Sequence, residues 1–253
     1  MTTRGISLTA LDGLPLIKPG DDIGTLLAAA LRRMQIEPVD QDIPVVAQKV
    51  VSKAEGRQVD LTQITPSAEA VELAGRAEKD PRLVEVILSE AKQVLRIRPG
   101  VIIVEHRLGF VCANAGVDHS NVEGEDVVLM LPEDPEQSAN RLRRALEQVS
   151  GARLGVLIID SHGRAWRMGT EGVAIGLSGL QALMDLRGWP DLFGDPLQVT
   201  QVGVADEVAA AASLLMGQAA EGRPVVHLRG MPYPLREGSI QELLRPKEED
   251  LFR

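Results

Sequence analysis

The hydrophobic positions of this chain follow two spacings, one typical of strands and the other of helices. Runs of β-branched and other apolar residues predict strands at 43–51, 101–105, 110–112, 154–159, 173–177 and 224–228. Apolar residues three and four apart predict helices that begin at Ser67, Asp80 and Asp134, and an alanine-rich helix over 206–220. Strands and helices alternate without a regular β-α-β rhythm. The pattern therefore predicts a mixed α+β fold and not a doubly wound sheet.

No repeat and no linker divides the sequence, so we expect one domain over residues 1–253. The segment after Gly230 is charged and interrupted by prolines, which favours a solvated surface helix or arm. The longest apolar runs are no longer than strands, and the first 14 residues do not resemble a signal peptide. We expect a soluble, cytoplasmic protein that does not enter a membrane.

The charge balance limits the possible partners. Thirty-six acidic residues against 27 basic ones give a net charge of -9, and 2% of the residues are aromatic. A general affinity for nucleic acid is excluded, because it requires a basic face and, for single strands, stacking aromatics. The single cysteine, Cys112, excludes an intrachain disulfide and a zinc site of several thiolates. Its apolar neighbours favour a buried structural thiol.

The first segment with candidate chemistry is 109–121. It leaves a predicted strand and becomes a run of small and polar residues that ends in Asp118, His119, Ser120 and Asn121. Small residues let backbone amides approach an anion, and a carboxylate offers a hard oxygen to a cation. The same residue types also favour an ordinary turn. Both interpretations stay open at this level.

The second segment, 158–167, is an apolar strand that delivers Asp160 and Ser161 at its end. This is a common way to present metal ligands, and Arg164 and Arg167 match phosphate or carboxylate oxygens. The alternative is an aspartate–arginine pair that ties down a loop.

A third candidate is Lys53, which follows a predicted buried strand and suits a phosphate contact, although a solvated turn is the simpler alternative. The chain has no Walker loop, no HExxH zinc motif and no G-x-S-x-G elbow. The chemistry therefore points away from zinc and serine hydrolases and from the common nucleotide-binding loop.

Together these segments resemble the coenzyme F420-0:L-glutamate ligase family. The resemblance extends over about 14–230 and depends on segments 52–57, 113–121, 160–167, 185–188, 205–207 and 216–219. It implies a two-lobed α+β fold, an intertwined homodimer and no fused C-terminal flavin domain. It also implies GTP-dependent addition of L-glutamate to the coenzyme precursor, with GDP and phosphate released.

The resemblance further implies a role for particular residues. Asp118 and Asp160 correspond to ligands of one Mg²⁺ or Mn²⁺, and Ser161 and Gln218 to ligands of a second, with K⁺ as a further ion. Asp118, Asp160 and Lys53 are the expected catalytic residues. The nucleotide positions are Leu14, Pro15, Leu16, Ile17, Gln48, Lys53, Asn121, Met216, Gly217, Gln218, Ala219, Ala220, Glu221, Gly222 and Arg223.

Three positions depart from the family pattern. Gln48 stands where a small hydroxyl residue is expected, Ser161 where threonine is frequent, and Ala165 where proline is common. The hydroxyl of Ser161 keeps the oxygen ligand, whereas Gln48 changes the chemistry of a nucleotide contact. The alternatives are an amide ligase for another acid, a metal-dependent phosphohydrolase and a non-catalytic protein that binds a nucleotide or metal.

Overall fold

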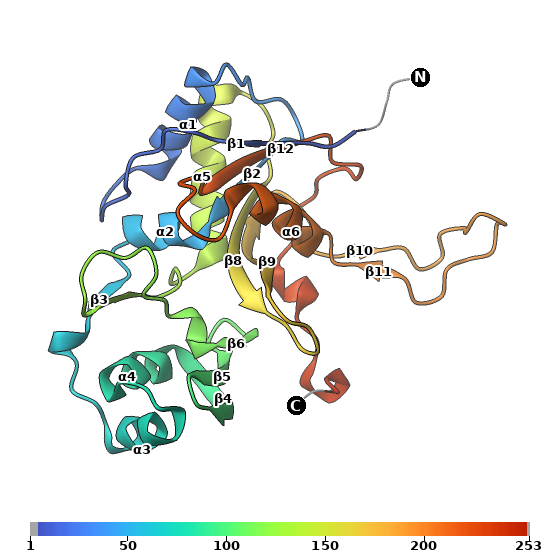
Figure 1. Cartoon of the computed structure of the whole chain (residues 1–253). Helices are drawn as coiled ribbons and strands as arrows, with labels where there is room; N and C mark the ends of the chain where they lie inside the picture. The colour runs from blue at the N-terminus through green and yellow to red at the C-terminus, as the bar shows by residue number, and fades with distance from the viewer. Residues whose placement is uncertain (1–4, 252–253) are drawn as a thin grey trace.

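The structure, a computed structural model, describes residues 5–251 and has a central five-stranded sheet (Figure 1). The strand order is β1-β12-β2-β8-β9, and only β2 and β8 are parallel neighbours. The strands are β1 (Ser7–Ala10), β2 (Ile43–Ala47), β8 (Val156–Gly163), β9 (Thr170–Ser178) and β12 (Val225–Arg229). The mixed α+β fold predicted from the sequence is confirmed.

Helices cover both faces of this sheet, which explains the continuous apolar runs of its central strands. Val46 and Ile158 pack into one core with α1, α2 and α5, whereas the adjacent residues Val45 and Leu157 pack into another with α6. Successive strand residues thus face opposite layers. The four helices are α1 (Ile23–Arg33), α2 (Gln48–Ala54), α5 (Pro135–Ser150) and α6 (Val204–Met216).

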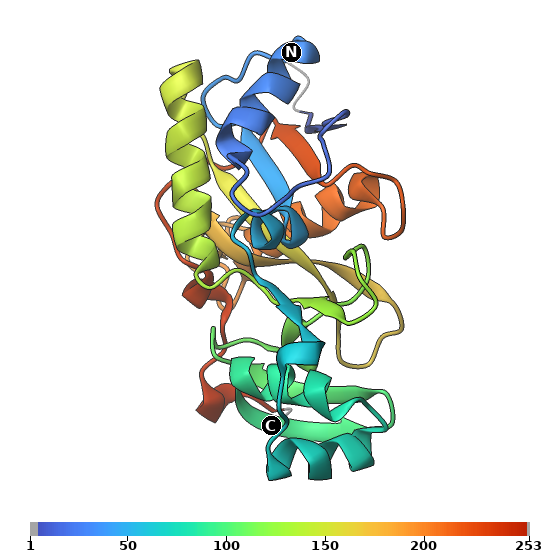
Figure 2. The ribbon, with the colours of Figure 1, turned by 90° about the vertical axis from the view of Figure 1, so that its left-hand side faces the viewer.

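A smaller lobe with a core of its own lies at one end of the molecule (Figure 2). It contains α3 (Ala68–Ala77), α4 (Pro81–Glu90) and the antiparallel strands β4 (Ala91–Arg98), β5 (Val101–His106) and β6 (Val111–Ala113). Strands β3 (Gln58–Asp60) and β7 (Val127–Leu129) pair between the two lobes. A short 3-10 turn, η1 (Leu61–Gln63), follows β3.

The predicted helix starts are confirmed at three positions. The side chains of Ser67, Asp80 and Asp134 each accept a hydrogen bond from a backbone amide in the first turn of the helix that follows. Pro81 and Pro135 occupy the first turn, where a missing N–H costs nothing.

Several predicted strand boundaries were wrong, and two of the differences affect the site. The strand predicted over 43–51 ends at Ala47, and α2 begins at Gln48, because Val50 and Val51 pack into the core from a helix. The strand predicted over 154–159 continues to Gly163, because its pairing with β9 extends beyond the buried part of the sheet.

The alanine-rich helix also has different bounds from those predicted. It runs from Val204 to Met216 and ends at Gly217, whose φ of 75° lies in the region that favours glycine. A Cβ at this position would lie 2.2 Å from Cδ of Glu221, so the Glu221 side chain would have to move. Residues 218–220 consequently belong to a loop.

The C-terminal segment packs back onto both lobes, so the prediction of a solvated helix or arm was wrong. It forms two short 3-10 turns, η3 (Ile240–Leu243) and η4 (Lys247–Glu249), and Ile240 is buried. Glu242 accepts hydrogen bonds from two backbone amides beside the central sheet, and Lys247 pairs with the buried Glu105 in the small lobe.

An arm that the hydrophobic pattern did not predict extends from the main lobe (Figure 1). Strands β10 (Met184–Asp185) and β11 (Gln201–Val202) form its base. Between them Leu192 is 99% exposed and Phe193 92%. Within residues 5–251 no helix is both long and apolar enough to cross a membrane.

Candidate functional site

A cleft of about 430 Å³ opens beside the central sheet, between α2, the carboxyl end of β2, the middle of β8 and the loop after α6. Strands β2 and β8 are parallel, and Ala47, the last residue of β2, pairs with Ile159 within β8. Ala47, Ile159 and Asp160 all line the cleft, so polar side chains of β8 and α2 meet where β2 ends.

The cleft collects segments that are far apart in the sequence. All the residues predicted to bind the nucleotide line it, from Leu14 to Ile17, through Gln48, Lys53 and Asn121, to the stretch from Met216 to Arg223. Asp160, Ser161 and Gln218 line it as well. Of the predicted site residues, all within the described part of the chain, only Asp118 is outside this lining.

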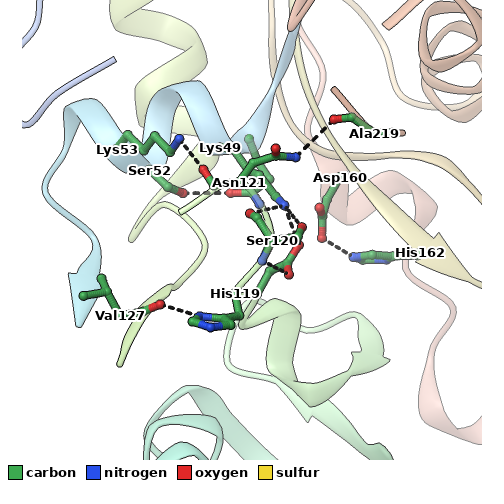
Figure 3. A network of polar contacts seen from close by, with 12 residues as sticks. Lys49, Ser52, Lys53, His119, Ser120, Asn121, Val127, Asp160, His162 and Ala219 are labelled. Atoms are coloured by element: carbon green, nitrogen blue, oxygen red, sulfur yellow. Dashed lines mark hydrogen bonds and ion pairs between the residues drawn. The ribbon is translucent and has the colours of Figure 1, made fainter. Parts of the chain in front are cut away.

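Asp118 is connected to the cleft through Lys49, a residue that the sequence analysis missed. The Lys49 Nζ donates to Asp118 Oδ2 at 2.5 Å, and to the Ser120 carbonyl oxygen and Oγ at 2.9 and 2.6 Å (Figure 3). Burial alone would raise the pKa of Asp118, but hydrogen bonds from Lys49 and Ser120 outweigh it and hold this pKa below its ordinary value. The carboxylate is therefore charged at neutral pH.

Lys53 lies one turn beyond Lys49 and contacts the same loop. Its Nζ donates to the Asn121 carbonyl oxygen at 2.6 Å, and Asn121 Nδ2 donates to the Ala219 carbonyl oxygen at 3.3 Å (Figure 3). Burial, together with the positive charge of Lys49, lowers the pKa of Lys53. Lys53 is in the last turn of α2, so it lies neither directly after a strand, as predicted, nor in the solvated turn that was the alternative.

Asp160 and Ser161 lie within β8 and not in a turn after it. Asp160 Oδ2 is 3.0 Å from His162 Nε2 (Figure 3). The His162 ring lies tilted against the Phe110 ring, with 5.5 Å between the ring centroids. Arg164 pairs with Glu171 across the β8–β9 hairpin. Asp160 and Arg164 therefore do not pair with each other, as the alternative interpretation of this segment required.

Gln48 begins α2 and is 1% exposed. Its Oε1 accepts a hydrogen bond from Ser52 Oγ at 2.9 Å, whereas its Nε2 has no hydrogen-bond partner within residues 5–251. A buried donor without a partner is costly, so a ligand acceptor at this position would stabilise it.

The oxygen donors around the cleft fit a hard divalent cation. In the described part of the chain no group of three or more His, Cys, Asp or Glu side chains gathers. Mg²⁺ is typically held by one or two carboxylates and completed by phosphate oxygens and water. Asp160, Ser161 and Gln218 in the cleft lining, with Asp118 beside it, supply this kind of donor set.

Comparison with known proteins identifies the family. A model of the F420-0:gamma-glutamyl ligase family matches residues 13–230. The chain belongs to this family. It is 48% identical to the coenzyme F420:L-glutamate ligase of Methanothermobacter thermautotrophicus, over 98% of this chain and 99% of that protein.

Two further relatives carry the same name. The coenzyme F420:L-glutamate ligase of Methanocaldococcus jannaschii is 46% identical over 99% of this chain and 98% of its own length. That of Archaeoglobus fulgidus is 44% identical over 98% and 96%. The resemblance found in the sequence is confirmed, and the chain is a ligase.

Proposed function

We propose that this ligase joins L-glutamate to the carboxylate of coenzyme F420-0, using GTP. The observation that carries the proposal is the cleft, because one cavity is lined by the predicted nucleotide positions together with Asp160, Ser161 and Gln218. The names of the relatives support the two substrates. The choice of nucleotide derives from the family resemblance.

The chemistry requires that the carboxylate be activated, since oxide does not leave from carbon. In the proposed sequence a carboxylate oxygen attacks the γ-phosphorus of GTP, and the bond between the β and γ phosphates breaks to release GDP. The glutamate nitrogen then attacks the carbonyl carbon of the acyl phosphate. The carbon–oxygen bond breaks, phosphate leaves, and the amine loses a proton to give the amide.

The residues around the cleft suit a reaction between anions. Lys53 contributes a positive charge for the phosphates, and the loop after Gly217 lines the same cleft. Asp118 and Asp160 would hold one Mg²⁺ or Mn²⁺, and Ser161 with Gln218 a second. A bound cation of this kind neutralises charge that develops on the transferred phosphoryl group. K⁺ is a further proposed ion.

Gln48 gives the proposed nucleotide contact a different character from a hydroxyl. Ser52 donates to its amide oxygen, which leaves the amide nitrogen as a donor. We expect the Gln48 amide to donate a hydrogen bond to GTP, because the amide nitrogen, like a hydroxyl, is a donor, although it cannot accept as a hydroxyl can.

The exposed arm supports the proposed homodimer. Leu192 and Phe193 between its two strands are almost fully exposed, Val199 is 83% exposed, and exposed apolar side chains on one arm suit an interface. A second copy of the chain that packs against the arm would cover these side chains.

The test of the proposed function is one set of incubations analysed by mass spectrometry. The complete reaction contains F420-0, L-glutamate, Mn²⁺ and GTP, and parallel reactions replace GTP by ATP or leave out glutamate. A product heavier by one glutamyl residue, formed with GTP and far more slowly with ATP, is expected, because unmatched base-edge hydrogen bonds in a pocket are costly. Phosphate release without that product would indicate a phosphohydrolase, and no turnover a binding protein.

A further inference from the structure

Lys49 is the charged residue at the cleft to which the proposed function gives no role. Its ammonium makes three hydrogen bonds, one to Asp118 and two to Ser120, which use its three N–H donors. Its side chain also lines the cleft. The Lys49 ammonium therefore contacts the Asp118 carboxylate, which the proposed function assigns to a metal ion.

The Asp118 carboxylate is surrounded by donors. Its Oδ2 accepts from Lys49 Nζ and from Ser120 Oγ at 2.8 Å, and its Oδ1 accepts from the Ser120 amide at 2.8 Å. These donors occupy both lone pairs of Oδ2 and one of the two on Oδ1, so a divalent ion that binds Oδ2 must displace Lys49 or Ser120. It would also meet the positive charge of Lys49 at close range, where like charges repel strongly.

The place of Lys49 in the fold allows its ammonium to move while the helix stays fixed. The neighbouring Val50 and Val51 anchor α2 in the core, and the lysine side chain itself is 25% exposed. Its four-carbon stem is flexible, and the cleft that it lines is the one proposed to hold phosphates.

We propose that Lys49 competes with the divalent cation for Asp118, and this inference rests on the cation assignment of the proposed function. When the cation binds, the ammonium leaves the carboxylate and contacts phosphate oxygens in the cleft. The two positive charges then face different anionic groups. The ammonium thus weakens cation binding in the nucleotide-free protein and aids the anionic substrates once they are bound.

In the experiment, the nucleotide-free protein is titrated with Mn²⁺ at constant pH and low salt, and the heat of binding is measured by calorimetry. Lys49→Met, which keeps an apolar stem without the charge, should bind Mn²⁺ about tenfold more tightly than the unchanged protein. Lys49→Arg is the matched control and should bind Mn²⁺ as the unchanged protein does. Lys49→Gln, which keeps a donor without the charge, should repeat the tightening if Lys49→Met does not fold.

Asp118→Asn separates the two proposals. Asp118→Asn should abolish most of the Mn²⁺ affinity. Adding Lys49→Met to Asp118→Asn should not tighten Mn²⁺ binding, because Lys49 and the cation compete for a carboxylate that the double variant lacks. If Asp118→Asn binds Mn²⁺ weakly while Lys49→Met and Lys49→Gln bind it no more tightly than the unchanged protein, the competition is refuted and the cation assignment stands. If Asp118→Asn leaves the affinity unchanged, both are refuted.

Turnover gives a second readout. With saturating Mn²⁺, Lys49→Met should lower kcat for glutamyl transfer and raise KM for the nucleotide, and Lys49→Arg should restore part of both. A Lys49→Met protein with unchanged kinetic constants would show that the ammonium only fastens the loop of Asp118 and Ser120 to α2.

Discussion

Replacing Glu90 by glutamine should weaken the contact between the two lobes. Glu90 is 7% exposed at the end of α4, and its carboxylate accepts from Arg57 Nη2 and from Arg107 Nε, both at 3.0 Å. Arg57 also donates to the Leu131 carbonyl oxygen, and Arg107 to the Glu133 carbonyl oxygen. The small lobe is thus fastened to the segment that leads into α5.

The magnitude follows from the pKa of this carboxyl. Burial alone would raise it, but the His106 ring, whose Nε2 lies 3.5 Å from Glu90 Oε2, and the charges of Arg107 and Arg57 outweigh burial and lower the pKa of Glu90 from 4.5 to about 2. A carboxyl with this difference between the unfolded and folded states contributes about 3 kcal/mol at neutral pH. For a chain of this size, that corresponds to a fall in Tm of roughly 6–12 °C.

The pH dependence gives the sharper test. Because the folded-state pKa is lowered, the stabilisation is complete above the ordinary pKa of 4.5 and is lost as the pH falls towards about 2. The Tm of Glu90→Gln should therefore lie well below that of the unchanged protein at pH 7 and converge with it at acid pH. Glu72→Gln, at an exposed pair with Arg76, is the control and should change Tm little. Equal Tm values for Glu90→Gln and the unchanged protein at pH 7 would refute the reasoning.

Three further predictions concern the site and the arm. Asp118→Asn and Asp160→Asn should each lower Mn²⁺ affinity and turnover at least tenfold, measured by calorimetry and product formation, and unchanged affinity in either would remove that residue from the site. Lys53→Ala should raise KM for GTP about tenfold or more and leave Tm nearly unchanged. The control is Lys79→Ala, because burial lowers the pKa of Lys79 as well, and it should change neither KM nor Tm. A large loss of Tm with normal kinetics would make Lys53 structural. If the protein is the proposed dimer, Phe193→Asp should shift its mass in solution, measured by light scattering, to that of a monomer. A dimer that persists in this variant would exclude the arm from the interface.

The parts of the fold that were predictable from the sequence have strong local signals. Caps at Ser67, Asp80 and Asp134 and the buried run at 154–159 belong to elements whose residue types and environment agree. The segment 48–51 was misread because Val50 and Val51 favour strands in isolation, while tertiary packing places them on a helix.

The site depended on information that no single segment contains. The sequence analysis missed Lys49 because it predicted a strand over 48–51. In the helix α2, Lys49 and Lys53 are four residues apart and therefore lie on the same face. Its partner Asp118 is 69 residues away in the sequence. The nucleotide and metal positions came from the family resemblance, and the fold shows that nearly all of them line one cleft.

We propose that glutamate is joined to the coenzyme through a phosphorylated carboxylate, and an oxygen-18 transfer experiment tests this step. F420-0 labelled with oxygen-18 in its terminal carboxylate is incubated with the protein, GTP, Mn²⁺ and L-glutamate, and the products are analysed by mass spectrometry. One labelled oxygen is expected in the released phosphate, together with unlabelled GDP and a coenzyme heavier by one glutamyl residue. Label in GMP, or a glutamylated product accompanied by unlabelled phosphate, would contradict it.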